Sequence, residues 1–230
     1  MFELTPLESE ALGLSMRVAL WSVAASLPFG LAMAWLLARY EFYGKTLLNG
    51  LVHLPLVLPP VVVGYLLLLL LGRQGPLGTW LFETFGISLP FTWEGAALAA
   101  AVMAFPLMVR AVRLSIEAVD QNLETAARTL GASRISVFLT ITLPLIMPGI
   151  LAGAVLAFAR SLGEFGATIT FVSNIPGETR TLPLALYSLL QTPGGEAGAL
   201  RLALLSVLLS LAALGASEAI ARRLRARLSD

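Results

Sequence analysis

Cysteine and histidine, which often serve as nucleophile, general base or metal ligand, are scarce in this sequence. It has no cysteine, so disulfides, thiolate metal sites and cysteine nucleophiles are excluded. His53 is the single histidine, and no Gly-x-Ser-x-Gly pattern supplies an activated serine for it. One histidine cannot complete a metal site. We therefore expect no enzyme, no metal and no cofactor, and we interpret His53 as an interfacial or helix-packing residue.

The tripeptide Gly44–Thr46, "GKT", resembles the end of a phosphate-binding loop. The full pattern needs another glycine five residues earlier, and Arg39 occupies that position. We expect a turn with a lysine at the membrane surface, and no ATP site in this chain.

Arg160 and Glu164 are spaced four residues apart in the apolar stretch "PGILAGAVLAFARSLGEFGAT". This spacing favours a helical ion pair, and ionisable residues in a membrane span are also candidates for function. The arginine could attract an anion near an outer mouth, but the pairing is favoured because both residues lie near the span's end. Gly149 and Gly153 form a G-x-x-x-G pair, which allows close helix contact within the chain or in a dimer.

These residues must be positioned by membrane helices. The sequence is 57% hydrophobic and 13% charged, and several apolar runs reach the roughly 20 residues needed to span a bilayer. No basic patch supports nucleic-acid binding, and the acidic start "MFELTPLESE" is not typical of a cleaved signal peptide. We expect an all-α integral membrane protein, residues 1–230 forming one transmembrane domain without internal repeats. Its five predicted spans are Leu12–Ala38, Leu47–Leu71, Gly95–Val112, Phe138–Leu162 and Leu200–Ala221.

Two segments between the spans bear on this count. Residues 72–94 are expected to be a Gly/Pro-rich loop. A sixth span could lie in "TLPLALYSLL" after Arg180, but about ten residues are too few to cross, so an interfacial or re-entrant helix is favoured.

The basic residues predict the orientation of the spans. One set of loops and the tail share most of them, whereas the opposite loops hold Arg73 and Arg180, with Arg160 and Arg201 near that boundary. Cytoplasmic loops are enriched in Lys and Arg, so we expect the N-terminus outside and the C-terminus in the cytoplasm. The residues on the basic side are Arg39, Lys45, Arg110, Arg113, Arg128, Arg134, Arg222, Arg223, Arg225 and Arg227.

Prolines interrupt the second predicted span. Pro55, Pro59 and Pro60 remove backbone donors and should kink or break the helix. Broken spans are tolerated where they face protein or a water-filled path. Pro59 and Pro60 are therefore candidates for a translocation pathway, together with Arg160 and Glu164, although a kink that serves packing alone remains open.

Residues 113–137 form the predicted cytoplasmic loop, and it contains an amphipathic stretch. Glu124 precedes Arg128 by four, which favours an ion pair, and Gly131 is expected to end the helix. A helix lying on the lipid surface is the alternative, but it would need bulkier anchors and more lysine. One face of the predicted helix holds Ile116, Val119, Leu123, Ala126, Ala127 and Leu130.

The same loop resembles the signature of importer permeases of the ATP-binding cassette (ABC) class. That signature reads E-A-A, three residues, Gly, nine residues, then I-x-L-P. The acid departs from it: the pattern expects it at Thr125, and this chain has Glu124, one residue early. The matching residues are Ala126, Ala127, Gly131, Ile141, Leu143 and Pro144.

Nearly the whole chain, and above all "AFARSLGEFGATITFVSNIPGETRTLPLALYSLLQTPGGE", resembles molybdate permease subunits, with tungstate and sulfate permeases as near relatives. The resemblance implies a homodimer in a bacterial or archaeal plasma membrane. It further implies two cytoplasmic ATP-binding subunits and a periplasmic or extracellular molybdate-binding protein. ATP hydrolysis would belong to the partner, and the helix around Glu124–Leu130 would be a coupling helix that docks on it, with Leu123 beside it. A secondary transporter or channel is the rival, but Glu164 is the one acid at an outer span end that could serve it.

Overall fold

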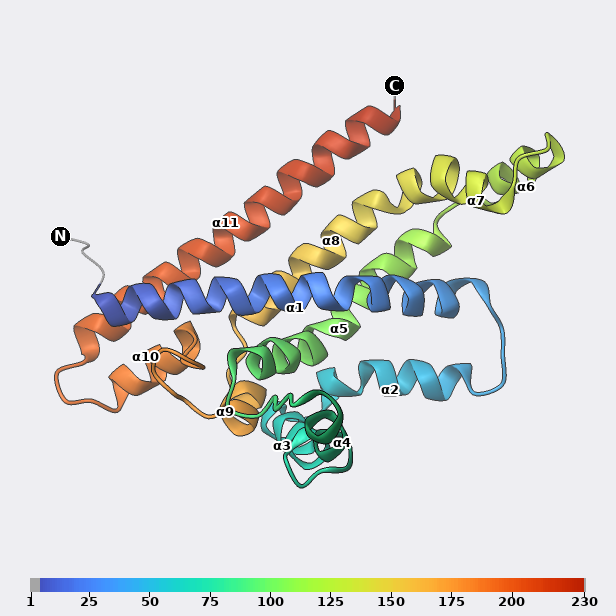
Figure 1. Ribbon diagram of the computed structural model, residues 1–230. Coiled ribbons are helices and arrows are strands. Elements are labelled where there is room, and N and C mark those ends of the chain that lie inside the picture. The colour runs from blue at the N-terminus through green and yellow to red at the C-terminus, as the bar shows by residue number, and fades with distance from the viewer. Residues whose placement is uncertain (1–4, 230) are drawn as a thin grey trace.

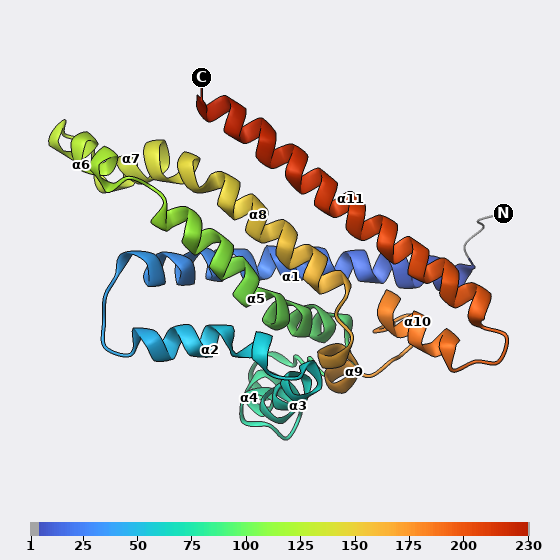
Figure 2. The same cartoon turned by 180° about the vertical axis from the view of Figure 1, so that it is seen from behind.

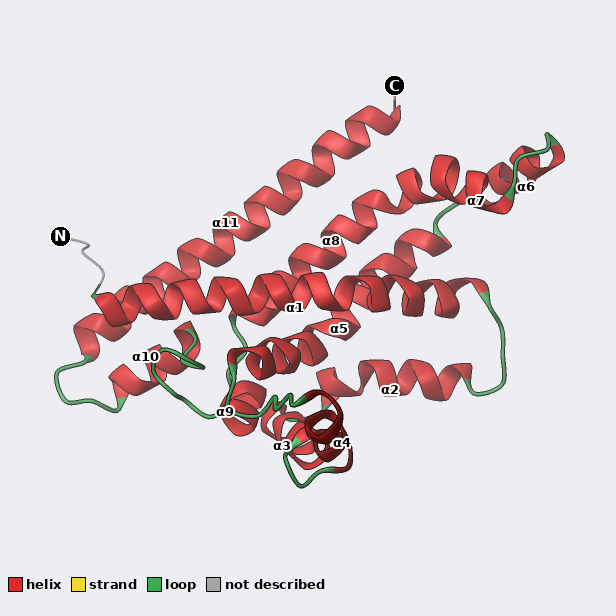
Figure 3. Ribbon diagram, viewed as in Figure 1, coloured by secondary structure: helices red, strands yellow, loops and turns green. Residues whose placement is uncertain are grey.

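The computed structural model describes residues 5–229, and every regular element in that range is a helix (Figures 1 and 3). The fold is all-α, as predicted. The elements are α1 (Pro6–Arg39), α2 (Lys45–Val57), α3 (Pro60–Leu71), α4 (Pro76–Phe85), α5 (Trp93–Glu117), α6 (Gln121–Thr129), α7 (Arg134–Val137), the π-helix η1 (Phe138–Thr142), α8 (Leu143–Leu162), α9 (Gly166–Val172), α10 (Leu182–Leu190) and α11 (Glu196–Ser229).

Four helical stretches are long and apolar enough to cross a membrane, and they confirm four of the five predicted spans. At about 1.5 Å per residue the 34 residues of α1 extend about 50 Å, so its ends project beyond a hydrocarbon core of about 30 Å. The four stretches are Pro6–Arg39, Trp93–Glu117, Arg134–Leu162 and Glu196–Ala216. The side chains of Arg222, Arg223, Arg225 and Arg227 and residues 1–4 lie outside the described part of the protein.

The second predicted span is broken, as its prolines predict. It consists of α2 and α3, which are bent by 116° relative to each other. Leu58 is extended, as a residue before proline tends to be, and Pro60 occupies the first turn of α3, where no backbone donor is needed. The expected break is therefore confirmed at Pro59 and Pro60, whereas Pro55 lies inside α2 without ending it.

The turned helix α3 packs closely against α9. A Cβ added to Gly64 would lie 2.5 Å from the carbonyl oxygen of Ala167, and one added to Gly166 would lie 2.8 Å from Cβ of Pro60. Two glycines thus allow the two short helices to approach each other at the bend.

Two short helices depart from the sequence-based expectations. The loop predicted for residues 72–94 contains α4, because Pro76 starts that helix and Gly86, at φ +68°, ends it. Helix α9 lies in a segment where only one short helix was expected, and that expected helix is confirmed as α10.

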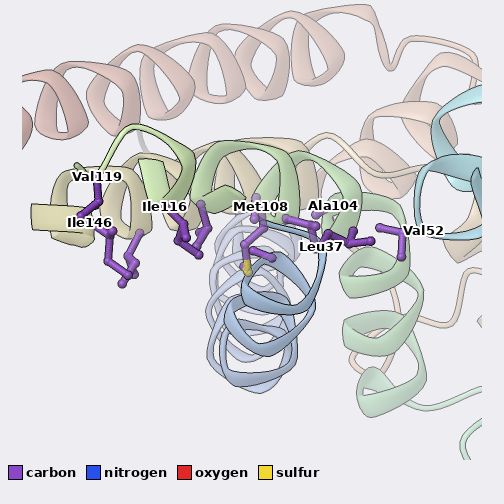
Figure 4. Close-up of a cluster of buried hydrophobic side chains, with 12 residues drawn as sticks. Leu37, Val52, Ala104, Met108, Ile116, Val119 and Ile146 are labelled. Carbon is purple, nitrogen blue, oxygen red and sulfur yellow. The ribbon is translucent and has the colours of Figure 1, made fainter. Parts of the chain in front are cut away.

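Helix α5 packs against both α1 and α8, and these three helices form the centre of the molecule (Figures 1 and 2). Ala104, Met108 and Ile116 on α5 are buried in a cluster with residues of the neighbouring helices (Figure 4). A Cβ on Gly149 would lie only 2.2 Å from Cβ of Ser115. The G-x-x-x-G pair therefore serves a contact within the chain, where small residues allow α8 to approach α5.

The outer faces of the long helices remain apolar. Leu204, Leu208 and Leu211 on α11 are each about half exposed or more, as are Leu47 and Leu51 on α2. Contiguous exposed apolar surface on helices of spanning length is typical of contact with lipid or with another membrane subunit.

Candidate functional site

Helix α6 lies at one end of the molecule, beyond α5, α7 and α8 (Figure 1). The side chain of Asp120 caps it by accepting a hydrogen bond from the Asn122 N–H at 2.9 Å. Gly131, at φ +91°, follows its last turn, which confirms the predicted stop.

The predicted apolar face is partly wrong, because α5 and α6 are separate helices. Ile116 lies in the last turn of α5 and Val119 in the link between the helices, and both are buried in the core. Asp120 competes for backbone donors and starts a new helix instead of continuing α5. The face that remains on and next to α6 consists of Leu123, Ala126, Ala127 and Leu130.

This face is largely uncovered. Leu123 is 49% exposed and Leu130 is 89% exposed, and none of the residues of α6 is buried. Ala126 is exposed and Ala127 partly so. A short apolar face with small residues in its centre can dock on the surface of another protein. We call these four residues the α6 face.

Glu124 does not form the predicted pair with Arg128. Its Oε1 lies 2.6 Å from Nη2 of Arg39, at the end of α1, and accepts a hydrogen bond from Oγ1 of Thr142 at 2.8 Å. Both charged side chains are mostly buried, at 19% and 12% exposure. The Coulomb attraction between two charges is stronger where water is largely excluded, which favours this long-range partner over the exposed Arg128. Thr125, where the signature expects its acid, is exposed and bonds within α6.

The second half of the signature lies where α8 begins. Ile141 belongs to η1, whose bonding extends to the Leu143 N–H donating to the carbonyl of Phe138. Pro144 has no N–H to donate to the carbonyl of Thr140, four residues earlier. The missing donor explains why the helix widens into a π-helix at this point.

Arg160 and Glu164 form the expected ion pair, with Nη1 and Oε2 2.6 Å apart. The other carboxylate oxygen, Oε1, accepts a hydrogen bond from the Ala167 N–H at 2.9 Å, so Glu164 joins α8 to the first turn of α9. Gly166 in the same turn of α9 lies against Pro60 of α3. Two of the four pathway candidates, Pro60 and Glu164, are therefore both close to the contact between α3 and α9.

His53 and the Gly44–Thr46 turn have contacts that fit structural roles. His53 Nδ1 lies 2.8 Å from the carbonyl oxygen of Asn49, one turn earlier in α2, in keeping with a helix-packing residue. Gly44 is the N-terminal cap of α2 at φ +88°, and Lys45 pairs with Glu41.

The sequence analysis assigned no contact to three charged residues of α1. Arg17 stacks on Trp93, with 3.7 Å between its guanidinium carbon and the ring centroid. Glu8 pairs with Arg201 of α11 at 2.9 Å. The pattern Thr5-x-x-Glu8 is a capping box, so the start of α1 was visible in the sequence, but its long-range partner was not. Arg39 was counted only for orientation.

The comparisons with known proteins agree with this arrangement. Residues 26–226 match the family described as "Binding-protein-dependent transport system inner membrane component". The chain belongs to this family. It is a multi-pass inner-membrane component of a transport system and not an enzyme.

Individual relatives and solved structures are consistent with the family. The molybdenum transport system permease protein ModB of Escherichia coli (strain K12) is 63% identical over 97% of this chain and 98% of its own length. ModB of Haemophilus influenzae is 59% identical over the same shares. A bacterial ABC transporter that imports alginate has a TM-score of 0.75 at 17% identity, covering 96% of this chain and 80% of that chain. An amino acid ABC transporter has a TM-score of 0.68 at 19% identity, covering 95% and 94%. At this level of identity the solved structures identify the ABC importer permease fold.

Proposed function

We propose that this chain is the membrane-spanning subunit of an ATP-driven molybdate importer. The observation that carries the proposal is the 63% identity to E. coli ModB over almost the full length of both chains. A sulfate importer is the second candidate, because the sulfate transport system permease protein CysT of E. coli is 44% identical, but over only 71% of this chain and 58% of its own length. A tungstate importer is a further alternative, because tungstate has the same charge and tetrahedral shape as molybdate.

The partners follow from the family and from the geometry of α6. Two copies of the chain form the membrane path, two separate subunits hydrolyse ATP, and an external binding protein delivers the anion. The α6 face supports docking of an ATP-binding subunit, since it is apolar, exposed and small in its centre. Within residues 1–230 as one permease domain, residues 113–137 are then its cytoplasmic loop, with the N-terminus of the chain outside and the C-terminus inside.

The pathway residues are part of the same proposal. The bend at Pro59 and Pro60 lies at the contact between α3 and α9, and Glu164, the partner of Arg160, accepts a hydrogen bond from the first turn of α9. A rearrangement of this contact could open or close the path between the two faces of the membrane. Because an importer must release its anion, we expect no tight molybdate site among these residues.

Substrate choice is tested by uptake. A strain that lacks this gene should lose uptake of radiolabelled molybdate at nanomolar concentration, and a plasmid copy should restore it. Sulfate uptake should remain unchanged in both strains. Loss of sulfate uptake, with molybdate uptake intact, would assign the chain to the second candidate. Competition of unlabelled tungstate with radiolabelled molybdate then shows which of these two anions the importer prefers.

Docking of the ATP-binding subunit on α6 is tested by two variants, each of which adds one negative charge, on opposite sides of the helix. Ala126→Glu places a carboxylate in the middle of the α6 face, where an unpaired buried charge costs several kcal/mol, and each ~1.4 kcal/mol weakens binding tenfold. We expect normal membrane abundance but loss of the co-purifying ATP-binding subunit. The matched control Gln121→Glu adds the same charge on the opposite side of the helix and should retain the subunit. Equal retention in both variants would rule out the α6 face as the docking site.

A further inference from the structure

The position of Glu124 separates it from the docking face. On a helix of 3.6 residues per turn, its side chain lies more than a quarter turn from the centre of the α6 face. It turns instead toward its own chain, where it contacts Arg39 and Thr142. An ATP-binding subunit on the α6 face therefore does not need to touch Glu124 to bind.

Few other contacts hold α6 to the membrane helices. None of its residues is buried. It is connected to α5 by a linker of three residues and to α7 by a linker of four. A helix attached in this way can move relative to the bundle when a partner pulls it, unless a specific contact transmits the movement.

Glu124 contacts both elements that such a movement must reach. Arg39 is the last residue of α1, and Thr142 is the last residue of η1, where α8 begins. Arg39 also lies over the ring of Trp35 at 5.3 Å, and Trp35 packs edge-on against Phe138 at the start of η1, with ring centroids 5.4 Å apart. The contacts form a closed ring that links α6, α1 and η1.

The arginine in this ring depends on Glu124. Among the described residues, Glu124 is the one acidic partner of Arg39, and the Nε of Arg39 is buried without a hydrogen-bond partner. Removing the carboxylate would leave a mostly buried guanidinium without a counter-charge. Thr142 also ends a π-helix, a form that is frequent at functional positions, so Glu124 contacts the irregular turn at the start of α8.

We propose that Glu124 is a positioning residue that transmits the movement of α6 to the end of α1 and the start of α8. The proposal rests on the proposed function, since it presumes that an ATP-binding subunit moves α6. Glu124 then acts after docking: it determines how much of each ATP cycle reaches the membrane helices, and not whether the ATP-binding subunit binds.

The test uses the full chain with its two ATP-binding subunits in proteoliposomes, with the binding protein supplied outside. Glu124→Gln keeps the size and an acceptor for Thr142 but removes the charge. We expect co-purification and ATP hydrolysis to persist. The number of ATP molecules hydrolysed per imported anion should rise about tenfold, the effect on an equilibrium of losing one charge-assisted contact.

Two further variants make the result specific. Glu117→Gln is the matched control, because Glu117 pairs with Arg113 at 2.7 Å within α5, and its carboxylate bonds to no second element among the described residues. Its ratio of ATP to anion should equal that of the wild type. The double exchange Arg39→Glu with Glu124→Arg rebuilds the pair in reverse and should recover part of the lost coupling.

Each outcome decides the matter. A wild-type ratio in Glu124→Gln overturns the proposal, and loss of the ATP-binding subunit in that variant would make Glu124 a docking residue instead. If Glu124→Gln lowers abundance, the double exchange decides: recovery of both abundance and coupling supports transmission, and recovery of abundance alone, or of neither, overturns it. If the wild-type complex imports no molybdate, the proposed function fails; the transmission role is judged separately, from the ratio for whichever anion is imported.

Discussion

The two ends of α1 are each joined by an ion pair to an element far away in the sequence. At one end Glu8 pairs with Arg201 of α11, and at the other Arg39 pairs with Glu124 of α6. Glu8 is 4% exposed and has a second task, because it accepts a hydrogen bond from the Thr5 N–H in the capping box of α1. Its carboxylate thus also caps the N-terminus of α1, the helix to which Glu8 belongs.

The pair at the other end also lies at helix ends, with Arg39 in the last turn of α1 and Glu124 in the first turn of α6. Both side chains, however, bond to other side chains and not to a capping backbone N–H. Glu124 lies on a nine-residue helix without buried residues, whereas Arg201 lies on the long helix α11, next to the buried Leu202. The first pair therefore joins two elements that are already packed in the bundle, and the second joins the bundle to an element that is otherwise exposed. Ion pairs of similar length can serve fixation in one place and transmission in another.

The largest effect is expected from Glu8→Ala. This change removes one half of the capping box, the hydrogen bond from the Thr5 N–H to the Glu8 carboxylate, worth about 1 kcal/mol, while Thr5 Oγ1 keeps its bond from the backbone N–H of residue 8. It also removes the partner of Arg201, whose partial exposure limits the further loss to about 1 kcal/mol. We expect a clear drop in the thermal unfolding temperature of the detergent-purified chain, with an unchanged ratio of ATP to imported anion. The control is Glu10→Ala, which removes an exposed acid two residues further along α1. An altered ratio in Glu8→Ala would show that both ends of α1 transmit.

A charge exchange should distinguish the two ends next. The double variant Glu8→Arg with Arg201→Glu restores opposite charges, but an arginine cannot accept the hydrogen bond from the Thr5 N–H. It should remain about 1 kcal/mol less stable than the wild type because this half of the capping box is lost. Full recovery of the unfolding temperature would mean that capping contributes little and that the two ion pairs are equivalent.

Thr142→Val should have a smaller and more selective effect. The change keeps the shape of a buried side chain and removes one hydrogen bond to Glu124, which contributes about 1 kcal/mol or somewhat more. Coupling should fall by less than in Glu124→Gln, because the contact with Arg39 remains. The control is Thr140→Val, because the hydroxyl of Thr140 donates its hydrogen bond to the carbonyl of Ser136 in the preceding turn and not to Glu124. Equal coupling in both valine variants would remove Thr142 from the ring of contacts.

Hydrophobic length and proline chemistry were sufficient to predict four spans, the break at Pro59 and the short helix α10. They act locally, within one stretch of chain. The stop at Gly131 was predictable for the same reason, since a glycine after an amphipathic run commonly ends a helix. Helix α4 was missed because its bounding residues, Gly75, Pro76 and Gly86, are loop formers by composition and helix caps by position.

Contacts between distant elements were the part that sequence patterns could not supply. The spacing of Glu124 and Arg128 favoured a pair, but Arg39, 85 residues away in the sequence, takes its place. Likewise Ile116 and Val119 fit the helical period of the α6 face, yet both pack into the core because the chain turns at Asp120. Periodicity does not show where one helix ends and the next begins within a continuous apolar pattern.

The smallest effect is expected from Glu41→Gln. Glu41 pairs with Lys45 close to the same end of α1 as Arg39, but its side chain is 88% exposed and the two residues are only four apart in the sequence. An exposed pair of this kind contributes less than about 0.5 kcal/mol and is screened by salt. Stability and the ratio of ATP to imported anion should therefore both match the wild type, at low and at high ionic strength. If Glu41→Gln uncoupled transport as strongly as Glu124→Gln, any charge at this end of α1 would serve, and the burial that separates the Arg39–Glu124 pair from its neighbour would not be what transmits movement.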